Sequence, residues 1–346
     1  MRLSAEWRYL VWVLLAFAAS TVSWYGLVQL QVGVPTGMSS FYYAIIRNKS
    51  QAAHRAATPK IVLLGESGTY FGIRADVMGR ELGMSTVNLA MTAALGPRYI
   101  MWNARRDIRP GDTVLLTIEY PLLCTADEMG PTLVNYVYER DPAYIRTLPL
   151  GERLVMPLRL SPHRLALGLL DRIAGRRSEH WLGSIPNALA YTTALGDGLY
   201  RPSAQPEMDA HWLVQPIDFD PRGPSPDLSA DIAEFAHWCR PRGVRLVLSY
   251  PAVAWGPDLE TTAARTFFAK LERLYASVGA EVQGTPESFF YDRSWFQDSR
   301  VHLKLQYAVL HTRQRATLLR ATLALAARQT APRAASRARA NGGRAH

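Results

Sequence analysis

The residues with the clearest chemical potential in this chain are a serine, a histidine and an aspartate in two short segments. Ser67 follows the apolar run 61–64, and Asp298 and His302 lie four residues apart far downstream. A serine hydroxyl is a weak nucleophile at neutral pH, so it needs a positioned base, usually a histidine that a carboxylate orients. The three residues are therefore the parts of a serine hydrolase or acyltransferase, with Ser67 as nucleophile, His302 as base and Asp298 as the orienting group.

The local sequence predicts where Ser67 should lie. The run 61–64 is short and apolar, and it starts with β-branched residues, as in a parallel strand covered on both faces. Gly65 ends the run and a helix is expected to follow, which places Ser67 at the edge where open α/β sheets bind ligands. A plainer interpretation is that Ser67 only caps the helix while Gly65 and Gly68 only make the turn. Gly-Glu-Ser-Gly is a weak motif and differs from the G-x-S-x-G elbow of the α/β-hydrolases.

Taken together, these segments resemble the SGNH (GDSL-like) hydrolase and acyltransferase superfamily. Within it they are similar to the membrane-anchored bacterial members associated with surface polysaccharide or teichoic-acid modification. The family's Gly-Asp-Ser motif is matched by residues 65–67, and its closing Trp-Phe-x-Asp-Ser-x-x-His-Leu segment by residues 295–303. Residues 86–91 and 112–120 stand in the place of its second and third blocks. The resemblance implies a Ser67–His302–Asp298 triad.

The chain departs from this family at the positions that bind the oxyanion. Glu66 replaces an Asp that orients the turn, and no glycine stands at residues 90–94, so the resemblance implies a backbone donor near Ala90 instead. Asn88 is a further candidate donor, although a structural asparagine at the end of a strand is an equally good interpretation. Glu119 stands where the family has an oxyanion Asn, and strand alternation predicts that it points away from the pocket. Both a working enzyme and a non-catalytic scaffold remain open.

Strands and helices alternate on both sides of these segments. The pattern predicts strands at 61–64, 86–89, 113–120, 244–250 and 280–282, and helices near 75–82, 98–107, 229–239, 259–278 and 303–327. Strands that alternate with helices of this length form βαβ units and a parallel sheet with helices on both faces. The expected fold is α/β, and the resemblance narrows it to a three-layer flavodoxin-like parallel sheet.

The N-terminal segment predicts a membrane anchor. Residues 9–30 are uncharged and long enough to cross a bilayer, and aromatic residues stand towards both ends of the stretch. Arg2 and Arg8 precede it, so residues 1–8 are expected in the cytoplasm and the remainder outside, in a single-pass protein of the bacterial inner membrane. A signal-peptidase site at residues 16–18 is the alternative, but the apolar stretch continues past it, which favours an uncleaved anchor.

The rest of the chain divides by composition. A connector is expected at 31–58, an SGNH-like domain at 59–330 with an insertion at about 125–228, and a disordered basic tail at 331–346. An insertion of this size usually forms a lid or binding surface. Four of its aromatic residues are candidates either for stacking on sugar rings or for a small core of its own, and they are Trp181, Tyr191, Tyr200 and Trp212.

Charge and cysteine content set the remaining expectations. The net charge is +10, with several arginines in the low-complexity tail, and no nucleic-acid-binding motif accompanies it. Cys124 and Cys239 form either one disulfide or two separate thiols. No Cys/His cluster has zinc spacing, so neither metal nor cofactor is expected. The resemblance implies an exported polysaccharide or its acyl ester as substrate and allows a membrane acyl-donor protein as partner. The rival function is a non-catalytic accessory protein that binds a glycan or a secretion partner.

Overall fold

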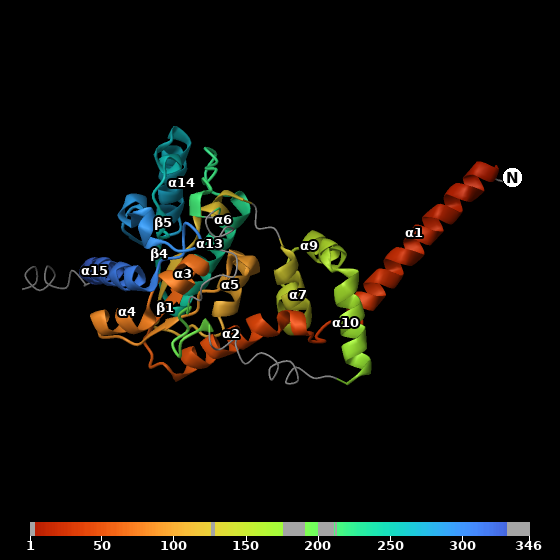
Figure 1. Cartoon of the computed structure of the whole chain (residues 1–346), viewed down its shortest axis with the longest axis horizontal. Coiled ribbons are helices and arrows are strands. Elements are labelled where there is room, and N and C mark those ends of the chain that lie inside the picture. Colours follow the sequence, from red (N-terminus) through yellow and green to blue (C-terminus); the bar gives the residue numbers. More distant parts are fainter. Residues whose placement is uncertain (1–3, 126–128, 176–190, 200–210, 212, 331–346) are drawn as a thin grey trace, which may run out of the picture. The chain divides into compact units, whose positions relative to one another are not determined.

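The computed structural model describes residues 4–125, 129–175, 191–199, 211 and 213–330, which divide into two compact units (Figure 1). The sheet unit contains residues 48–128 and 191–346, and the N-terminal unit contains residues 1–47 and 129–190. The expected tail at 331–346 and the aromatic residues Trp181, Tyr200 and Trp212 lie outside the described residues.

The sheet unit is built on five parallel strands in the order β2-β1-β3-β4-β6. These strands are β1 (Ile61–Leu64), β2 (Thr86–Asn88), β3 (Thr113–Thr117), β4 (Arg245–Ser249) and β6 (Glu281–Gln283). Counted along the chain, this is the order 2-1-3-4-5 of flavodoxin-like sheets. The predicted α/β fold with a parallel sheet is therefore confirmed. Two short strands, β5 (Val253–Ala254) and β7 (Phe290–Tyr291), form a separate parallel pair.

Helices cover both faces of this sheet because its strands are apolar on both sides. Alternate strand residues Ile61, Leu63 and Leu115 pack in a buried cluster with Met78 of α4 and Leu319 of α15. The intervening strand residues are also fully buried, and α5 and α13 contact β1 and β4 (Figure 1). The helices of the unit are α3 (Ser67–Gly72), α4 (Ala75–Leu82), α5 (Pro97–Ala104), α6 (Tyr120–Cys124), α13 (Pro226–Cys239), α14 (Thr262–Ser277) and α15 (Leu305–Thr330).

Short 3₁₀ turns complete the connections of both units. They are η1 (Ala93–Leu95), η2 (Met156–Arg159), η4 (Arg240–Arg242), η5 (Pro257–Glu260), η6 (Pro286–Phe289) and η7 (Arg293–Trp295). The two cysteines of the sheet unit are free thiols, so the structure decides between the two alternatives in favour of no disulfide. Burial raises the pKa of Cys124 to about 11 and that of Cys239 to about 12, which keeps both thiols protonated at neutral pH.

The N-terminal unit begins with α1 (Ala5–Gln29), which is long and apolar enough to cross a membrane. α2 (Gly37–Arg55) follows it, and the unit adds α7 (Pro131–Arg140), α8 (Pro142–Ile145), α9 (Leu150–Val155) and α10 (Pro162–Ile173).

A buried polar cluster holds this unit together. Arg164 and Glu139 are both fully buried, with 3.4 Å between the guanidinium and the carboxylate. Gln31 accepts from Arg164 at 2.8 Å, and Thr36 donates to Glu139 through both its backbone and its hydroxyl. Because of these contacts, residues 129–190 of the predicted insertion group with the N-terminal segment, while residues 191–228 group with the sheet. A lid over the site stays a prediction.

Candidate active site

Ser67 lies at the carboxyl edge of the sheet, where the strand order reverses. β2 pairs with one side of β1, and β3 pairs with the other side and leads on to β4 and β6. The carboxyl ends of β1 and β3 therefore meet at the switch point of the sheet, which is where open α/β sheets bind ligands. Ser67 is the first residue of α3, two residues after Gly65 and three after the end of β1. Glu119 follows β3 at the same switch point.

Gly65 allows the ends of these two strands to approach each other. Its φ is +151°, and a Cβ at this position would lie 2.2 Å from the backbone oxygen of Thr117 and 2.7 Å from the Thr69 hydroxyl. The hydroxyl groups of Thr69 and Thr117 also hydrogen-bond to each other. Only glycine fits this position, because any side chain would collide with the backbone of β3. The turn that carries Ser67 is thereby held against the end of β3.

The Glu119 side chain points towards Ser67, the candidate nucleophile, and accepts a hydrogen bond from its hydroxyl. Its Oε1 accepts a hydrogen bond of 2.8 Å from the Ser67 hydroxyl and one of 2.7 Å from the backbone N–H of Gly68. The prediction that Glu119 points away from the pocket is therefore wrong. It assumed that strand alternation continues to residue 120, but β3 ends at Thr117 and Glu119 is the N-cap of α6, with φ −65° and ψ 137°.

Glu66 fixes the backbone of Glu119. The Glu66 side chain is 1% exposed, and its Oε2 accepts a hydrogen bond of 3.0 Å from the Glu119 backbone N–H. Glu66 therefore ties the loop after β1 to the loop after β3. This contact holds the Glu119 side chain at the start of α3.

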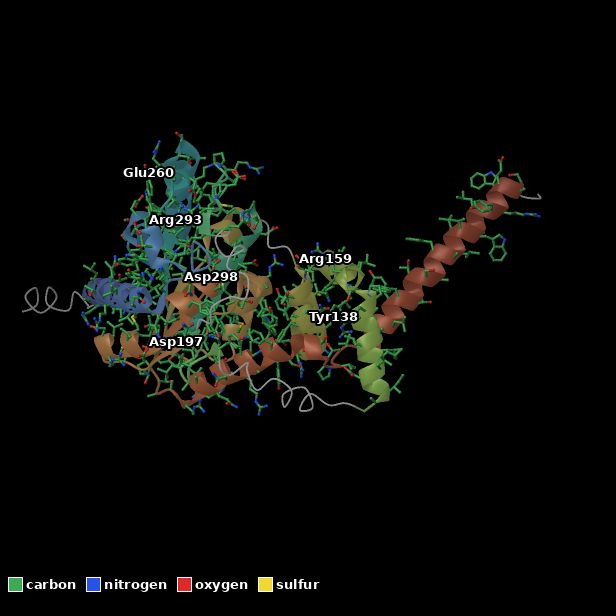
Figure 2. The ribbon with its side chains drawn as sticks, in the orientation of Figure 1. Tyr138, Arg159, Asp197, Glu260, Arg293 and Asp298 are labelled. Atoms are coloured by element: carbon green, nitrogen blue, oxygen red, sulfur yellow. The ribbon has the colours of Figure 1, made fainter. Side chains whose placement is uncertain are left out.

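Asp298 and His302 form a hydrogen-bonded pair. His302 Nδ1 lies 2.8 Å from Asp298 Oδ1 (Figure 2 labels Asp298). A carboxylate only accepts, so Nδ1 carries the proton of the neutral ring and Nε2 has a free lone pair. Nε2 is buried and has no hydrogen-bond partner in the part of the chain that the structure describes. In the neutral ring, the pair therefore leaves Nε2 available as a proton acceptor.

This pair lies beside the helix that carries Ser67. The ring of His302 packs edge-on against Phe71 of α3, with 4.9 Å between ring centroids. A Cβ on Gly68 would lie 3.4 Å from Val301. No hydrogen bond joins Ser67 to His302 in this structure, because the Ser67 hydroxyl donates to Glu119 instead. The structure thus brings Ser67, His302 and Asp298 to one edge of the sheet without closing the link between the first two.

Arg300 holds the segment between Asp298 and His302 in place, although the sequence patterns did not single it out. Its side chain is 5% exposed and donates to the backbone oxygen of Ala254 at 2.8 Å and to Asp258 at 2.6 Å. The guanidinium therefore anchors this loop to β5. The sequence does place a charged residue inside the matched segment 295–303, but the residues that it contacts are distant in the sequence.

The predicted oxyanion donors form a structural cluster. Asn88 is fully buried, and its amide donates to the backbone oxygens of Thr69 at 3.2 Å and Ile73 at 3.1 Å. Its Oδ1 accepts from the backbone N–H of Ala90 at 3.0 Å. Both residues are therefore engaged in holding α3 to the end of β2, which is the structural interpretation left open for Asn88. The Ala90 N–H has an internal acceptor, unlike the free donor expected there.

Two other donors are unused. The backbone N–H of Ser67, at the start of α3, has no acceptor among the described residues. The Thr92 hydroxyl is buried, and it too lacks a partner within the described ranges. Met91, next to Thr92, donates its backbone N–H to the backbone oxygen of Gly65 at 3.0 Å. This contact holds the loop after β2 against the turn that carries Ser67. Ser67 N–H and the Thr92 hydroxyl are therefore two donors that an oxyanion can use.

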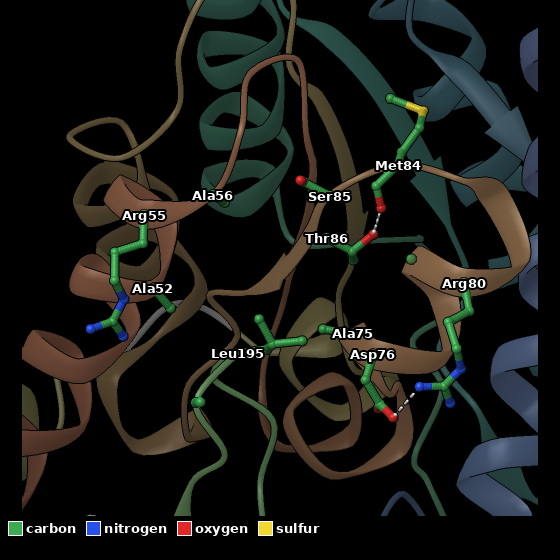
Figure 3. Close-up of a pocket in the computed structure, with 12 residues that line it drawn as sticks. Ala52, Arg55, Ala56, Ala75, Asp76, Arg80, Met84, Ser85, Thr86 and Leu195 are labelled. Carbon is green, nitrogen blue, oxygen red and sulfur yellow. Dashed lines mark hydrogen bonds and ion pairs between the residues drawn. The ribbon is translucent and has the colours of Figure 1, made fainter.

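A separate hollow of about 570 Å³ lies away from this edge (Figure 3). Its lining includes Ser85 and Thr86 at the start of β2, Asp76 of α4 and Arg55 of α2. The starts and ends of parallel strands lie on opposite edges of a sheet, so this hollow is not the site of Ser67. No group of three or more His, Cys, Asp or Glu side chains suited to a metal ion occurs among the described residues.

Comparison with known proteins adds little to this geometry. No protein-family model and no curated protein matches the chain. Among solved structures, it is similar to protein YxiM from Bacillus subtilis, with 10% sequence identity and a TM-score of 0.33. That match covers 77% of this chain and 57% of YxiM, so the chain spans little more than half the length of that protein. A similarity this weak carries no argument, and the candidate site depends on its own geometry.

Proposed function

We propose that this chain is a membrane-anchored SGNH-type serine esterase or O-acyltransferase that acts on an exported or cell-surface polysaccharide. Ser67 is its nucleophile, and His302, oriented by Asp298, supplies a general base. The observation that carries this proposal is the Asp298–His302 pair, whose Nε2 is left without a partner in the described structure beside the helix that begins with Ser67. A membrane acyl-donor protein would supply the acyl group in the transferase form of the reaction.

The resting geometry is compatible with a nucleophile that moves. Ser67 is half-buried, and rotation about its χ1 changes the direction of the hydroxyl without moving α3. Catalytic hydrogen bonds are often long or misaligned without substrate and tighten only in the complex. The unused N–H of Ser67 then provides one donor to the acyl oxygen, which is how acyl-transfer enzymes stabilise their tetrahedral intermediates.

Labelling with a fluorophosphonate tests the proposal. The purified full chain in detergent should react at a single serine, identified as Ser67 by mass spectrometry, and it should release p-nitrophenol from p-nitrophenyl acetate. Serine-directed fluorophosphonates react with nucleophiles that a base activates, so an ordinary helix-capping serine stays unlabelled. A folded sample that neither labels nor turns over the ester would contradict the enzyme proposal.

One observation favours a second candidate, a non-catalytic accessory protein that binds a glycan or a partner in a polysaccharide secretion complex. The Ser67 hydroxyl donates a hydrogen bond to Glu119, which stands where the SGNH family has its oxyanion Asn. A carboxylate close to a developing oxyanion raises the energy of that charge. Glycan binding by a folded sample that fails to label would support this candidate.

The proposed location makes its own prediction. If α1 spans the inner membrane with residues 1–8 inside, a reporter enzyme that works only after export should be active when fused after Lys60. A reporter that works only in the cytoplasm should be inactive at the same position and active when fused to a cytoplasmic control protein. The reverse pattern at Lys60 would contradict the proposed topology.

A further inference from the structure

Glu119 has the contacts of a catalytic base. We propose that Glu119 takes the proton of Ser67 as the acyl-enzyme forms, and that the His302–Asp298 pair activates the second substrate. This inference rests on the proposed function, because it assigns the proton transfers of that same site. It follows from a hydrogen bond of 2.8 Å in which the Ser67 hydroxyl donates its proton to Glu119 Oε1.

The geometry suits proton transfer from the serine. A general base must lie about 2.6–3.2 Å from the atom that gives up the proton, and Glu119 already meets this condition before any substrate is bound. Its carboxylate is fixed by Gly68 N–H at 2.7 Å, its backbone is fixed by Glu66, and the residue is only 7% exposed. A Cβ on Gly68 would lie 3.3 Å from Glu119 Oε1, so glycine at that position allows this close approach.

In the acylation step, the charges around the new oxyanion favour Glu119 over His302 as the acceptor of the Ser67 proton. If His302 took the proton, the site would contain the Glu119 carboxylate and the oxyanion side by side, and two like charges a few ångströms apart disfavour each other. If Glu119 takes it, the carboxylate becomes neutral as the oxyanion forms, so the site carries a single negative charge during acylation. The neutral carboxyl group is also a hydrogen-bond donor. It can therefore stabilise the oxyanion in the place where the family has an Asn.

The full sequence of transfers balances. Ser67 Oγ forms a bond to the acyl carbon of the ester while its proton passes to Glu119 Oε1. The bond from that carbon to the leaving oxygen breaks, and the leaving alkoxide takes the proton back from Glu119. A second hydroxyl, from the acceptor or from water, then attacks the acyl carbon and gives its proton to His302 Nε2. Ser67 Oγ leaves and recovers a proton from His302.

The test separates acylation from turnover in the full-length protein. With p-nitrophenyl acetate, the burst of p-nitrophenol reports acylation and the steady state reports the complete cycle. Glu119→Gln keeps the shape and the acceptor oxygen for Gly68 N–H but cannot take the proton, so the burst rate should fall by about 10²–10⁴-fold. Glu260→Gln, at an exposed glutamate, is the matched control and should behave as wild type.

His302→Gln provides a measurement that does not depend on how the Glu119 variant folds. Its steady-state rate should fall by a much larger factor than its burst rate, which should stay near that of the wild-type protein. A His302→Gln burst rate that falls as far as its steady-state rate, or a Glu119→Gln burst at the wild-type rate or faster, would overturn the inference while leaving the serine enzyme intact. A folded wild-type protein with no burst and no labelled Ser67 would instead overturn the proposed function, and the inference with it.

Discussion

Replacement of Ser67 by alanine should lower ester turnover by at least about 10³-fold, because removal of a nucleophile leaves only the binding and oxyanion contributions of a serine enzyme. Fluorophosphonate labelling should disappear in the same variant. The fold should survive, since Glu119 Oε1 keeps its hydrogen bond to the Gly68 N–H. The loss of one half-buried hydroxyl should change the free energy of unfolding by about 1 kcal/mol.

The matched control is Ser85→Ala, at the opposite edge of the sheet. Ser85 lines the hollow at the start of β2, and its backbone oxygen accepts from Ile61, a bond that alanine preserves. Turnover and labelling in this variant should equal those of the wild-type protein. A Ser67→Ala variant that retains turnover would show that another group is the nucleophile, and peptide mapping of the residual label would identify it.

Gly65→Ala should strongly destabilise the sheet unit. A Cβ would lie 2.2 Å from the backbone oxygen of Thr117, and the φ of +151° is one that side chains rarely adopt. Neither strand can retreat without breaking the pairing of β1 with β3, so we expect a loss of about 3 kcal/mol or more in the free energy of unfolding. The shift in the urea midpoint of the sheet unit measures it.

Gly83→Ala separates conformational strain from steric collision. Gly83 ends α4 with a φ of +66°, and a Cβ there would have nothing within 4 Å. Its substitution should therefore cost only the strain of a left-handed residue, about 1–2 kcal/mol. Equal destabilisation by the two substitutions would show that the close approach of β1 to Thr117 contributes nothing to the stability of the turn.

The local features of this protein follow from its sequence because they depend on short-range patterns. The run Ile61–Leu64 is buried as a parallel strand, Gly65 ends it, and Ser67 begins the next helix. Alternating strands and helices were enough to predict a parallel sheet, because each apolar strand has to be covered on both faces. The spacing of Asp298 and His302 within one short loop likewise allowed their pairing to be expected.

The arrangement around Ser67 was decided only by the tertiary structure. Glu119 points at the serine because β3 ends two residues before it, and a strand's end depends on its neighbours in the sheet as much as on its own residues. Ala90 N–H is engaged by Asn88, a contact that packing of the loop after β2 against α3 determines. Arg300 anchors the loop that carries Asp298 and His302 through partners more than forty residues away in the sequence. Side-chain direction and hydrogen-bond partners at the ends of strands depend on contacts between distant segments, and the pattern of a single segment does not encode them.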